Sequence, residues 1–301
     1  MELNETLNGV LLVCAALLPA IVLCIYIFKK DSVDKEPVLL LLSLLAVGVA
    51  ICYPAAEIES VFNKLLAKLF EPLGKNIGGT VYLSGVPYRL YHACKYFIGV
   101  ALVEEGLKFV AMCFVTGKNK NFNSLFDGLV YAVFVSLGFA ALENVLYVRQ
   151  YGWINALTRG VLSVPGHMFF GVIMGYYYSL WHMHTKAKNR EQILKRAGYI
   201  AREEKEFSGT YYLVMSLLVP VLAHGMYDFC CTNNSLLSTL AFYGFIVYLY
   251  IYCFTKIRNV SRFDMRDSMC ANALLQQKYP HLKDALQGDL FSSEEQTESP
   301  L

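Results

Sequence analysis

Residues 7–28 read LNGVLLVCAALLPAIVLCIYIF, an apolar stretch without a single charged side chain. A helix of about 20 such residues crosses the roughly 30 Å core of a bilayer, because its backbone polar groups are satisfied inside the segment. Six further stretches of this kind follow, near residues 38–55, 93–115, 126–148, 157–181, 211–231 and 236–255. Only 17% of all residues are charged, against roughly 25% in an ordinary soluble domain. The sequence therefore predicts an all-α polytopic membrane protein with about seven transmembrane helices.

The distribution of Lys and Arg over the loops indicates how these helices are oriented, because both residues tend to stay on the cytoplasmic side. With the N-terminus outside, the predicted cytoplasmic segments hold sixteen Lys and Arg residues and the outer segments hold six. We therefore expect a multi-pass protein of the cell membrane with an outer N-terminus and a cytoplasmic C-terminus. The net charge is only +2, so the sequence offers no basic surface for a nucleic acid.

Two segments outside the predicted spans differ in character. Residues 57–92 carry apolar side chains at helical spacing beside Lys64 and Lys68, which predicts an amphipathic helix at the membrane surface followed by a glycine-rich loop. The chain ends in the polar run SSEEQTESPL, a composition typical of disorder. We accordingly expect a membrane-embedded domain over residues 1–260 and a cytoplasmic, disordered tail over residues 261–301.

Ionisable side chains occur inside four of the predicted spans, where a charge costs from a few to more than ten kcal/mol. They are Glu104, Glu105 and Lys108 in the third span, Glu143 beside Asn144 in the fourth, His167 in the fifth, and His224 and Asp228 in the sixth. Such residues normally face the interior of a helix bundle and mark a functional site. We therefore expect these side chains to meet in one polar cavity inside the membrane.

The spacing within two of these groups indicates a division of labour. Glu104 and Glu105 lie four and three residues before Lys108, so both carboxylates reach its ammonium group on one face of a helix. We expect only one of the two to face the cavity and act as a base, and the sequence alone does not say which. His224 and Asp228 are one turn apart, so the carboxylate can hold the imidazole in one orientation.

Four motifs in this order resemble the PrsW family of intramembrane proteases, which is similar to the CAAX prenyl endopeptidases. They are Glu104-Glu105-x-x-Lys108, the stretch from Asp127-Gly128 through Gly138-Phe139 to Glu143-Asn144, Pro165-Gly166-His167, and His224-Gly225-Met226-Tyr227-Asp228. The acidic-proline stretch Asp34-Lys35-Glu36-Pro37 also looks like that family. Together the motifs cover roughly residues 30 to 230.

The resemblance implies a glutamate-dependent endopeptidase without metal or other cofactor, which cuts a single-span membrane protein. In bacterial relatives the substrate is an anti-sigma factor, and the cut is the first of a cascade. By this analogy Glu104 or Glu105 is the general base, with Lys108 and Asn144 in support. Glu143 stands where prenyl endopeptidases carry a histidine, and His167 and His224 complete the catalytic pocket.

The last motif departs from the prenyl endopeptidases, which commonly carry Asn where this chain has Asp228. An ionised Asp cannot donate a hydrogen bond to an oxyanion, so we expect His224 to donate and Asp228 to orient it. Three of the site residues, Glu143, His167 and His224, fall on the outer side of the middle of their spans. The predicted pocket therefore opens outward, which fits a first cut on the extracytoplasmic side.

Three alternatives remain open at this stage. A zinc-dependent membrane protease would use the same Glu, His and Asp side chains as ligands, although the sequence has no H-E-x-x-H motif. A proton-coupled transporter would use the carboxylates as a relay, although the spans lack the matched broken helices of many transporters. A non-catalytic scaffold would hold a helix of a partner protein.

Overall fold

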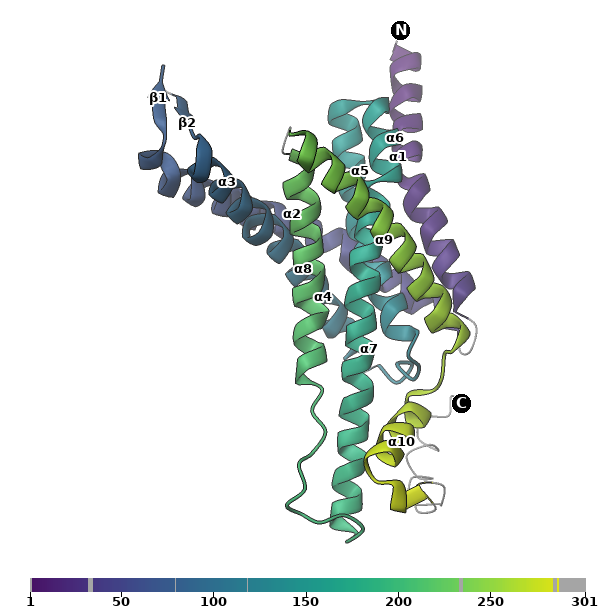
Figure 1. Cartoon of the computed structure of the whole chain (residues 1–301). Coiled ribbons are helices and arrows are strands. Elements are labelled where there is room, and N and C mark those ends of the chain that lie inside the picture. Colours follow the sequence, from purple (N-terminus) through teal and green to yellow (C-terminus); the bar gives the residue numbers. More distant parts are fainter. Residues whose placement is uncertain are drawn as a thin grey trace.

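The computed structural model describes residues 2–31, 35–78, 80–117, 119–232, 235–283 and 286, and this part of the chain is helical almost throughout (Figure 1). Asp34 of the acidic-proline stretch lies outside the described residues. The helices and strands are α1 (Glu2–Lys30), α2 (Val38–Phe70), η1 (Glu71–Leu73), β1 (Lys75–Ile77), β2 (Thr80–Tyr82), α3 (Gly85–Ala93), η2 (Cys94–Leu102), α4 (Val103–Thr116), α5 (Asp127–Tyr151), α6 (Trp153–Val161), α7 (Ser163–Arg196), α8 (Thr210–Thr232), α9 (Leu236–Arg262), α10 (Asp267–Lys278) and η3 (Pro280–Leu282).

Six helical segments of the described chain are long and apolar enough to cross a membrane. They belong to α1, α2, α5, α8, α9 and the run of α6 and α7. The predicted all-α polytopic membrane protein is thereby confirmed. The remaining predicted span, near residues 93–115, is also helical, but it is divided between η2 and α4 and carries four charged side chains.

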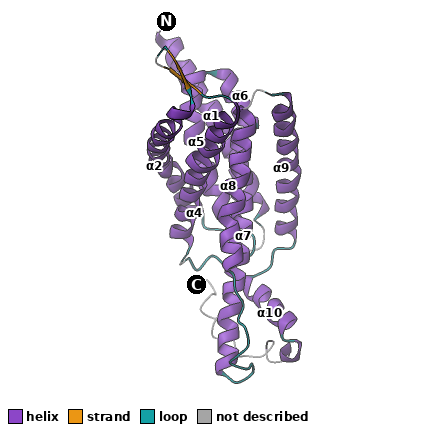
Figure 2. Cartoon of the chain, turned by 60° about the vertical axis from the view of Figure 1, so that its left-hand side comes forward, coloured by secondary structure: helices purple, strands orange, loops and turns teal. Residues whose placement is uncertain are grey.

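Helices α5 and α7 lie side by side at the centre of the bundle and are covered by the other helices (Figure 2). A helix that is apolar on all sides belongs in such a position, and α5 is buried almost continuously from Asp127 to Ala140. Small residues let the backbones approach closely: a Cβ on Gly175 of α7 would lie 2.3 Å from the Gly128 carbonyl oxygen of α5. Towards α2, a Cβ on Gly138 of α5 would lie 2.2 Å from the Leu45 carbonyl oxygen. These contacts fix α5, which carries Glu143, against its neighbours.

Helix α2 is longer than the sequence predicts. The span expected to end at residue 55 and the expected surface helix form one continuous helix that passes through Pro54, and the good helix formers Ala55-Ala56-Glu57 follow directly. Its second half exposes the apolar residues Val61 and Leu65. The expected glycine-rich loop contains the antiparallel pair β1–β2, in which Ile77 faces Thr80. This hairpin projects from the bundle at the end where the N-terminus lies (Figure 1).

Helix η2 is a π-helix and directly precedes the Glu104-Glu105 pair of α4. π-Helical turns are rare and are frequently found at functional sites. The η2 backbone lies close to α2 at Gly99, where a Cβ would approach the Phe62 ring to 2.5 Å. A π-turn contains more residues than an α-turn. The side chains of α4 therefore point in other directions around the helix axis than a regular α-helix continued from α3 would give them.

At the other end of the molecule α7 extends beyond the bundle, and α10 packs beside it (Figure 1). Leu275 and Tyr279, four residues apart, are buried in a cluster with Leu194 of α7. The buried guanidinium of Arg190 donates to the Ser268 carbonyl oxygen. Our expectation of disorder from residue 261 on is therefore wrong for α10 and η3, which bury an apolar face. Residues 284–285 and 287–301 lie outside the described residues, and the boundary between the two domains stays a prediction.

Asp267 holds the start of α10 against α7, and its removal should loosen this helix. Its carboxylate lies 3.2 Å from His182 Nε2 and accepts from Lys186 Nζ at 2.9 Å. Burial opposes ionisation, but these two partners outweigh it and lower the pKa of Asp267. The contribution of Asp267 is therefore present at neutral pH and is lost only as the pH falls through the lowered pKa, below 3.8.

We expect Asp267→Asn to reduce the protection of the α10 amides in hydrogen exchange at pH 7 by about 1.5–3 kcal/mol, the value of hydrogen bonds to a charged group. The exposed carboxylate Glu203, in the loop between α7 and α8, provides the control variant Glu203→Gln. Unchanged α10 protection in Asp267→Asn would contradict this role.

Candidate active site

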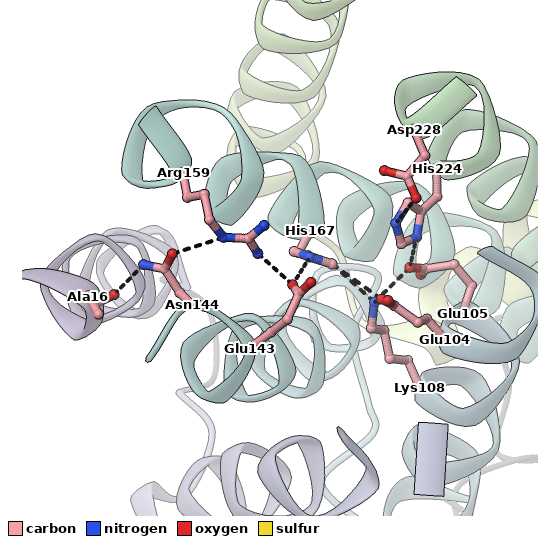
Figure 3. A network of polar contacts seen from close by, with 10 residues as sticks. All are labelled: Ala16, Glu104, Glu105, Lys108, Glu143, Asn144, Arg159, His167, His224 and Asp228. Carbon is pink, nitrogen blue, oxygen red and sulfur yellow. Dashed lines mark hydrogen bonds and ion pairs between the residues drawn. The ribbon is translucent and has the colours of Figure 1, made fainter. Parts of the chain in front are cut away.

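A cavity of about 600 Å³ lies at the end of the bundle nearest the N-terminus. Its wall is formed by α2, η2 and α4 to α9. Five of the residues predicted from the sequence line it: Glu104, Glu143, His167, His224 and Asp228. The other three, Glu105, Lys108 and Asn144, are fully buried behind the wall. The structure thus brings side chains from four helices to one polar hollow (Figure 3).

Lys108 is the centre of the polar network. Its ammonium group donates to Glu104 Oε2 at 3.0 Å and to Glu105 Oε1 at 2.8 Å, and it lies 3.1 Å from His167 Nδ1. An ammonium group has three donors, so all of its hydrogen-bonding capacity is used. The Nζ atom also lies 4.2 Å from the centre of the Phe139 ring. Lys108 therefore joins α4 to α7 and balances part of the charge of two carboxylates.

The carboxylates of Glu104 and Glu105 differ in what they face. Glu104 is 5% exposed and belongs to the cavity wall, whereas Glu105 is 0% exposed and does not. Glu105 Oε1 is held by Lys108 and by His224 Nδ1, 2.9 Å away. The sequence could not separate the two residues, and the structure gives Glu104 the access to the cavity that a base needs.

The hydrogen bonds of His167 define its tautomer. Its Nδ1 atom faces the Lys108 ammonium, which can only donate, so Nδ1 must accept. The proton therefore sits on Nε2, which lies 2.9 Å from Glu143 Oε2 and donates to it. His167 thus bridges Lys108 and Glu143.

His224 is held between two carboxylates. Its Nδ1 donates to Glu105 Oε1 at 2.9 Å, while Nε2 lies 3.6 Å from Asp228 Oδ2. The second distance is too long for a good hydrogen bond, so Glu105 orients the ring more directly than Asp228 does. Asp228 lies on the cavity wall beside the ring.

Arg159 is a member of the network that sequence reasoning missed. Its Nη2 atom lies 2.8 Å from Glu143 Oε2, and its Nε donates to Asn144 Oδ1 at 3.1 Å (Figure 3). Asn144 in turn donates to the Ala16 carbonyl oxygen of α1 at 2.8 Å. Asn144 therefore supports the site through Arg159. The predicted span near residues 157–181 is continuous across the break between α6 and α7, so the sequence gives no sign that Arg159 reaches this site.

Replacing Arg159 should disturb the position of Glu143. We expect Arg159→Met to reduce the rate of any reaction at this site by about 10–100-fold, because it removes the ion pair with Glu143 and the hydrogen bond to Asn144. Arg159→Lys should recover part of this loss, since it keeps the charge but not the fork of donors. The exposed Arg149 at the same end of the bundle provides the control variant Arg149→Met. Equal rates in Arg159→Met and Arg149→Met would exclude a role for Arg159.

Glu104, Glu105, His167 and His224 also present ligand atoms that all lie within 4.8 Å of one another. Two carboxylates and two imidazoles are donors that suit zinc. As arranged, however, the Lys108 ammonium occupies the space between three of these donors, at 2.8–3.1 Å. A metal ion fits the donor types but not the arrangement, because it would have to displace Lys108.

Two further polar residues of the cavity wall come from α2, where we expected a surface helix, and two from η2. They are Glu59 and Asn63 of α2 and Lys95 and Tyr96 of η2. The spacing of Glu59 and Asn63, four residues apart, was a signal that they share one face. It could not be connected to the site without knowing that α2 continues past residue 55.

Most of the chain is similar to known proteins of one family. Residues 36–255, which include every predicted site residue, match the profile of the family described as PrsW family intramembrane metalloprotease. The chain belongs to the PrsW family of intramembrane proteases. The resemblance inferred from the four motifs is thereby confirmed.

Two members of the PrsW family, both named Protease PrsW, are similar over nearly their whole length. The protein from Bacillus subtilis (strain 168) is 30% identical over 256 residues, which cover 84% of this chain and 97% of that protein. The protein from Shouchella clausii (strain KSM-K16) is 29% identical over 252 residues, covering 84% of this chain and 98% of its own. No solved structure matches the chain.

Proposed function

We propose that this PrsW family member is a glutamate-type intramembrane endopeptidase in which Glu104 activates the attacking water. The observation that supports this most is the asymmetry of the glutamate pair. Glu104 borders the cavity, whereas Glu105 is fully enclosed by Lys108 and His224. A general base must reach the proton that it takes, and of this pair only Glu104 borders the cavity.

The proposed reaction uses the residues in distinct roles. Glu104 takes a proton from water while the water oxygen attacks the carbonyl carbon of the scissile bond. His224 donates a hydrogen bond to the oxyanion that develops, and Glu105 and Asp228 keep its ring in place. Glu104 then passes its proton to the leaving amine as the carbon–nitrogen bond breaks. Lys108, His167, Glu143 and Arg159 fix the carboxylate of Glu104 and are positioning residues.

For the substrate we propose a single-span membrane protein, an anti-sigma factor, cut as the first step of its processing. The resemblance to bacterial relatives suggests this class. The cavity lies at the end of the bundle that carries the N-terminus, and the distribution of Lys and Arg favours an outer position for that end. A cut on the extracytoplasmic side of a cell-membrane substrate is consistent with this orientation.

A zinc-dependent protease is the second candidate, because the four ligand atoms lie close together and the family is described as one of intramembrane metalloproteases. Glu104, Glu105, His167 and His224 would hold the ion. When bound, it would polarise the scissile carbonyl and lower the pKa of a bound water. This candidate requires that Lys108 leaves its present position.

The decisive experiment uses the purified full-length protein in liposomes with a single-span peptide of an anti-sigma factor. We expect cleavage, identified by the masses of both products, that persists in a chelator such as 1,10-phenanthroline and in preparations without stoichiometric metal. Loss of cleavage in the chelator, with recovery on adding Zn²⁺, would replace the glutamate-type assignment by the zinc-dependent one. Absence of cleavage of any single-span substrate would contradict the protease proposal itself.

A further inference from the structure

The continuation of α2 past residue 55 brings two polar side chains to the cavity that the proposed chemistry does not use. Glu59 and Asn63 are one helical turn apart and line the cavity together with Glu104. Both can present oxygen acceptors to its interior. This face of α2 therefore adds a polar wall to the space in which the substrate is cut.

The other carboxylates of the cavity wall each have a cationic neighbour. Glu104 lies 3.0 Å from Lys108, Glu143 lies 2.8 Å from Arg159, and Asp228 lies 3.6 Å from His224. Among the residues that the structure describes, Glu59 has no hydrogen bond or ion pair of this kind. It is thus the carboxylate of this cavity that lacks a cationic partner within the described chain.

Asn63 adds an acceptor of the same character. Its Oδ1 atom is buried and has no hydrogen-bond partner within the described chain. A buried acceptor without a partner is costly, so Asn63 gains hydrogen-bond energy when its side chain turns towards a donor that a substrate brings into the cavity. Together, the Glu59 carboxylate and the Asn63 amide oxygen are suited to bind a positively charged group with several N–H donors.

Lys95 of η2 also lines the cavity and is a cation that could in principle neutralise Glu59. Its Nζ atom lies 5.3 Å from the centre of the Tyr96 ring, and no ion pair joins it to Glu59 in the described part of the chain. The positive charge of Lys95 is therefore directed at an aromatic face. Glu59 and Asn63 therefore remain available to bind a group of the substrate.

We propose that Glu59 and Asn63 form a subsite that selects a Lys or Arg side chain of the substrate close to the scissile bond. The subsite rests on the proposed peptidase function, because Glu104 and the α2 wall border the same cavity. A basic side chain satisfies both acceptors, a neutral one leaves Glu59 unmatched, and an acidic one is repelled. A site built to bind a donor discriminates strongly against substrates that lack it.

The test measures kcat/KM for three sets of single-span peptides. Each set carries Lys, Gln or Glu at a single position near the cleaved bond, and this position is shifted by one residue from one peptide of the set to the next. With the wild-type protein we expect a preference of about 10-fold or more for Lys over Gln at one position, in line with hydrogen bonds to a charged group. Glu59→Gln should bring this ratio close to one, and Glu59→Lys should shift it towards the Glu peptide. Asn63→Leu should lower the ratio by a smaller factor.

The matched control is Glu57→Gln, because Glu57 is an exposed carboxylate on the same helix that does not line the cavity. It should keep the wild-type ratio. The ratio compares peptides on one preparation, so partial misfolding of a variant does not imitate the effect. Wild-type cleavage without any Lys preference, or a preference retained in Glu59→Gln, would overturn the subsite while leaving the peptidase proposal intact. If the wild-type protein cleaves none of the peptides, both the subsite and the peptidase proposal are overturned.

Discussion

Glu104→Gln should lower kcat/KM for cleavage of a single-span substrate by at least about 100-fold, the range expected for loss of a general base. Gln has nearly the same shape, and its side-chain oxygen can still accept from Lys108, so the network around Lys108 keeps most of its contacts. The unfolding temperature in detergent should therefore stay near that of the wild type. Quantified product formation and thermal unfolding on the same preparation measure the two effects separately.

Glu105→Gln is the matched comparison, because the two glutamates are neighbours and both contact Lys108. Glu105 also holds His224 and has no exposure to the cavity. Its substitution should lower the unfolding temperature and reduce activity through the misplaced His224 ring. Near-wild-type cleavage in both variants would end the assignment of a catalytic glutamate, and loss of folding in both would show that Glu104 is structural as well.

Much of this site could be predicted from the sequence because a charge in a bilayer is expensive. Glu104, His167 and His224 stand out in apolar stretches for that reason, and the structure brings them to one cavity. The choice between Glu104 and Glu105 could not be made in the same way. It depends on the angular phase of α4, which the preceding π-helix η2 changes. A regular 3.6-residue pattern contains no information on such a turn.

The residues that sequence reasoning missed depend on where helices end. Arg159 lies on α6, which ends before α7 begins at Ser163, and that break turns its side chain towards Glu143. Glu59 belongs to the site because α2 continues where the hydrophobic pattern becomes amphipathic. Hydrophobicity reports the depth of a segment in the membrane, but not whether the backbone continues as a helix. Polar residues near the ends of spans are therefore the ones most easily assigned to loops.

Lys108→Met should be the most destabilising single substitution in the network, by about 3–5 kcal/mol, because breaking a buried ion pair leaves uncompensated charge. The ammonium is 0% exposed and serves Glu104, Glu105 and His167 at once. Met has a similar length, so the volume of the site is conserved and the loss reports charge rather than packing. Unfolding in a denaturant series, followed by helical circular dichroism in detergent, measures the difference.

A double variant separates charge compensation from any other role of Lys108. In Lys108→Met/Glu105→Gln the fully enclosed carboxylate is neutral as well, so the burial penalty that Lys108 offsets is largely removed. We expect the double variant to be more stable than Lys108→Met alone while remaining inactive, because Glu104 has lost the cation that positions it. Since the residues are in contact, the two effects should not add, and the deviation gives their interaction energy. If the losses in free energy of unfolding of the two single variants add up in the double variant, Lys108 and Glu105 act independently. The Lys108 ammonium would then not be the centre of the network.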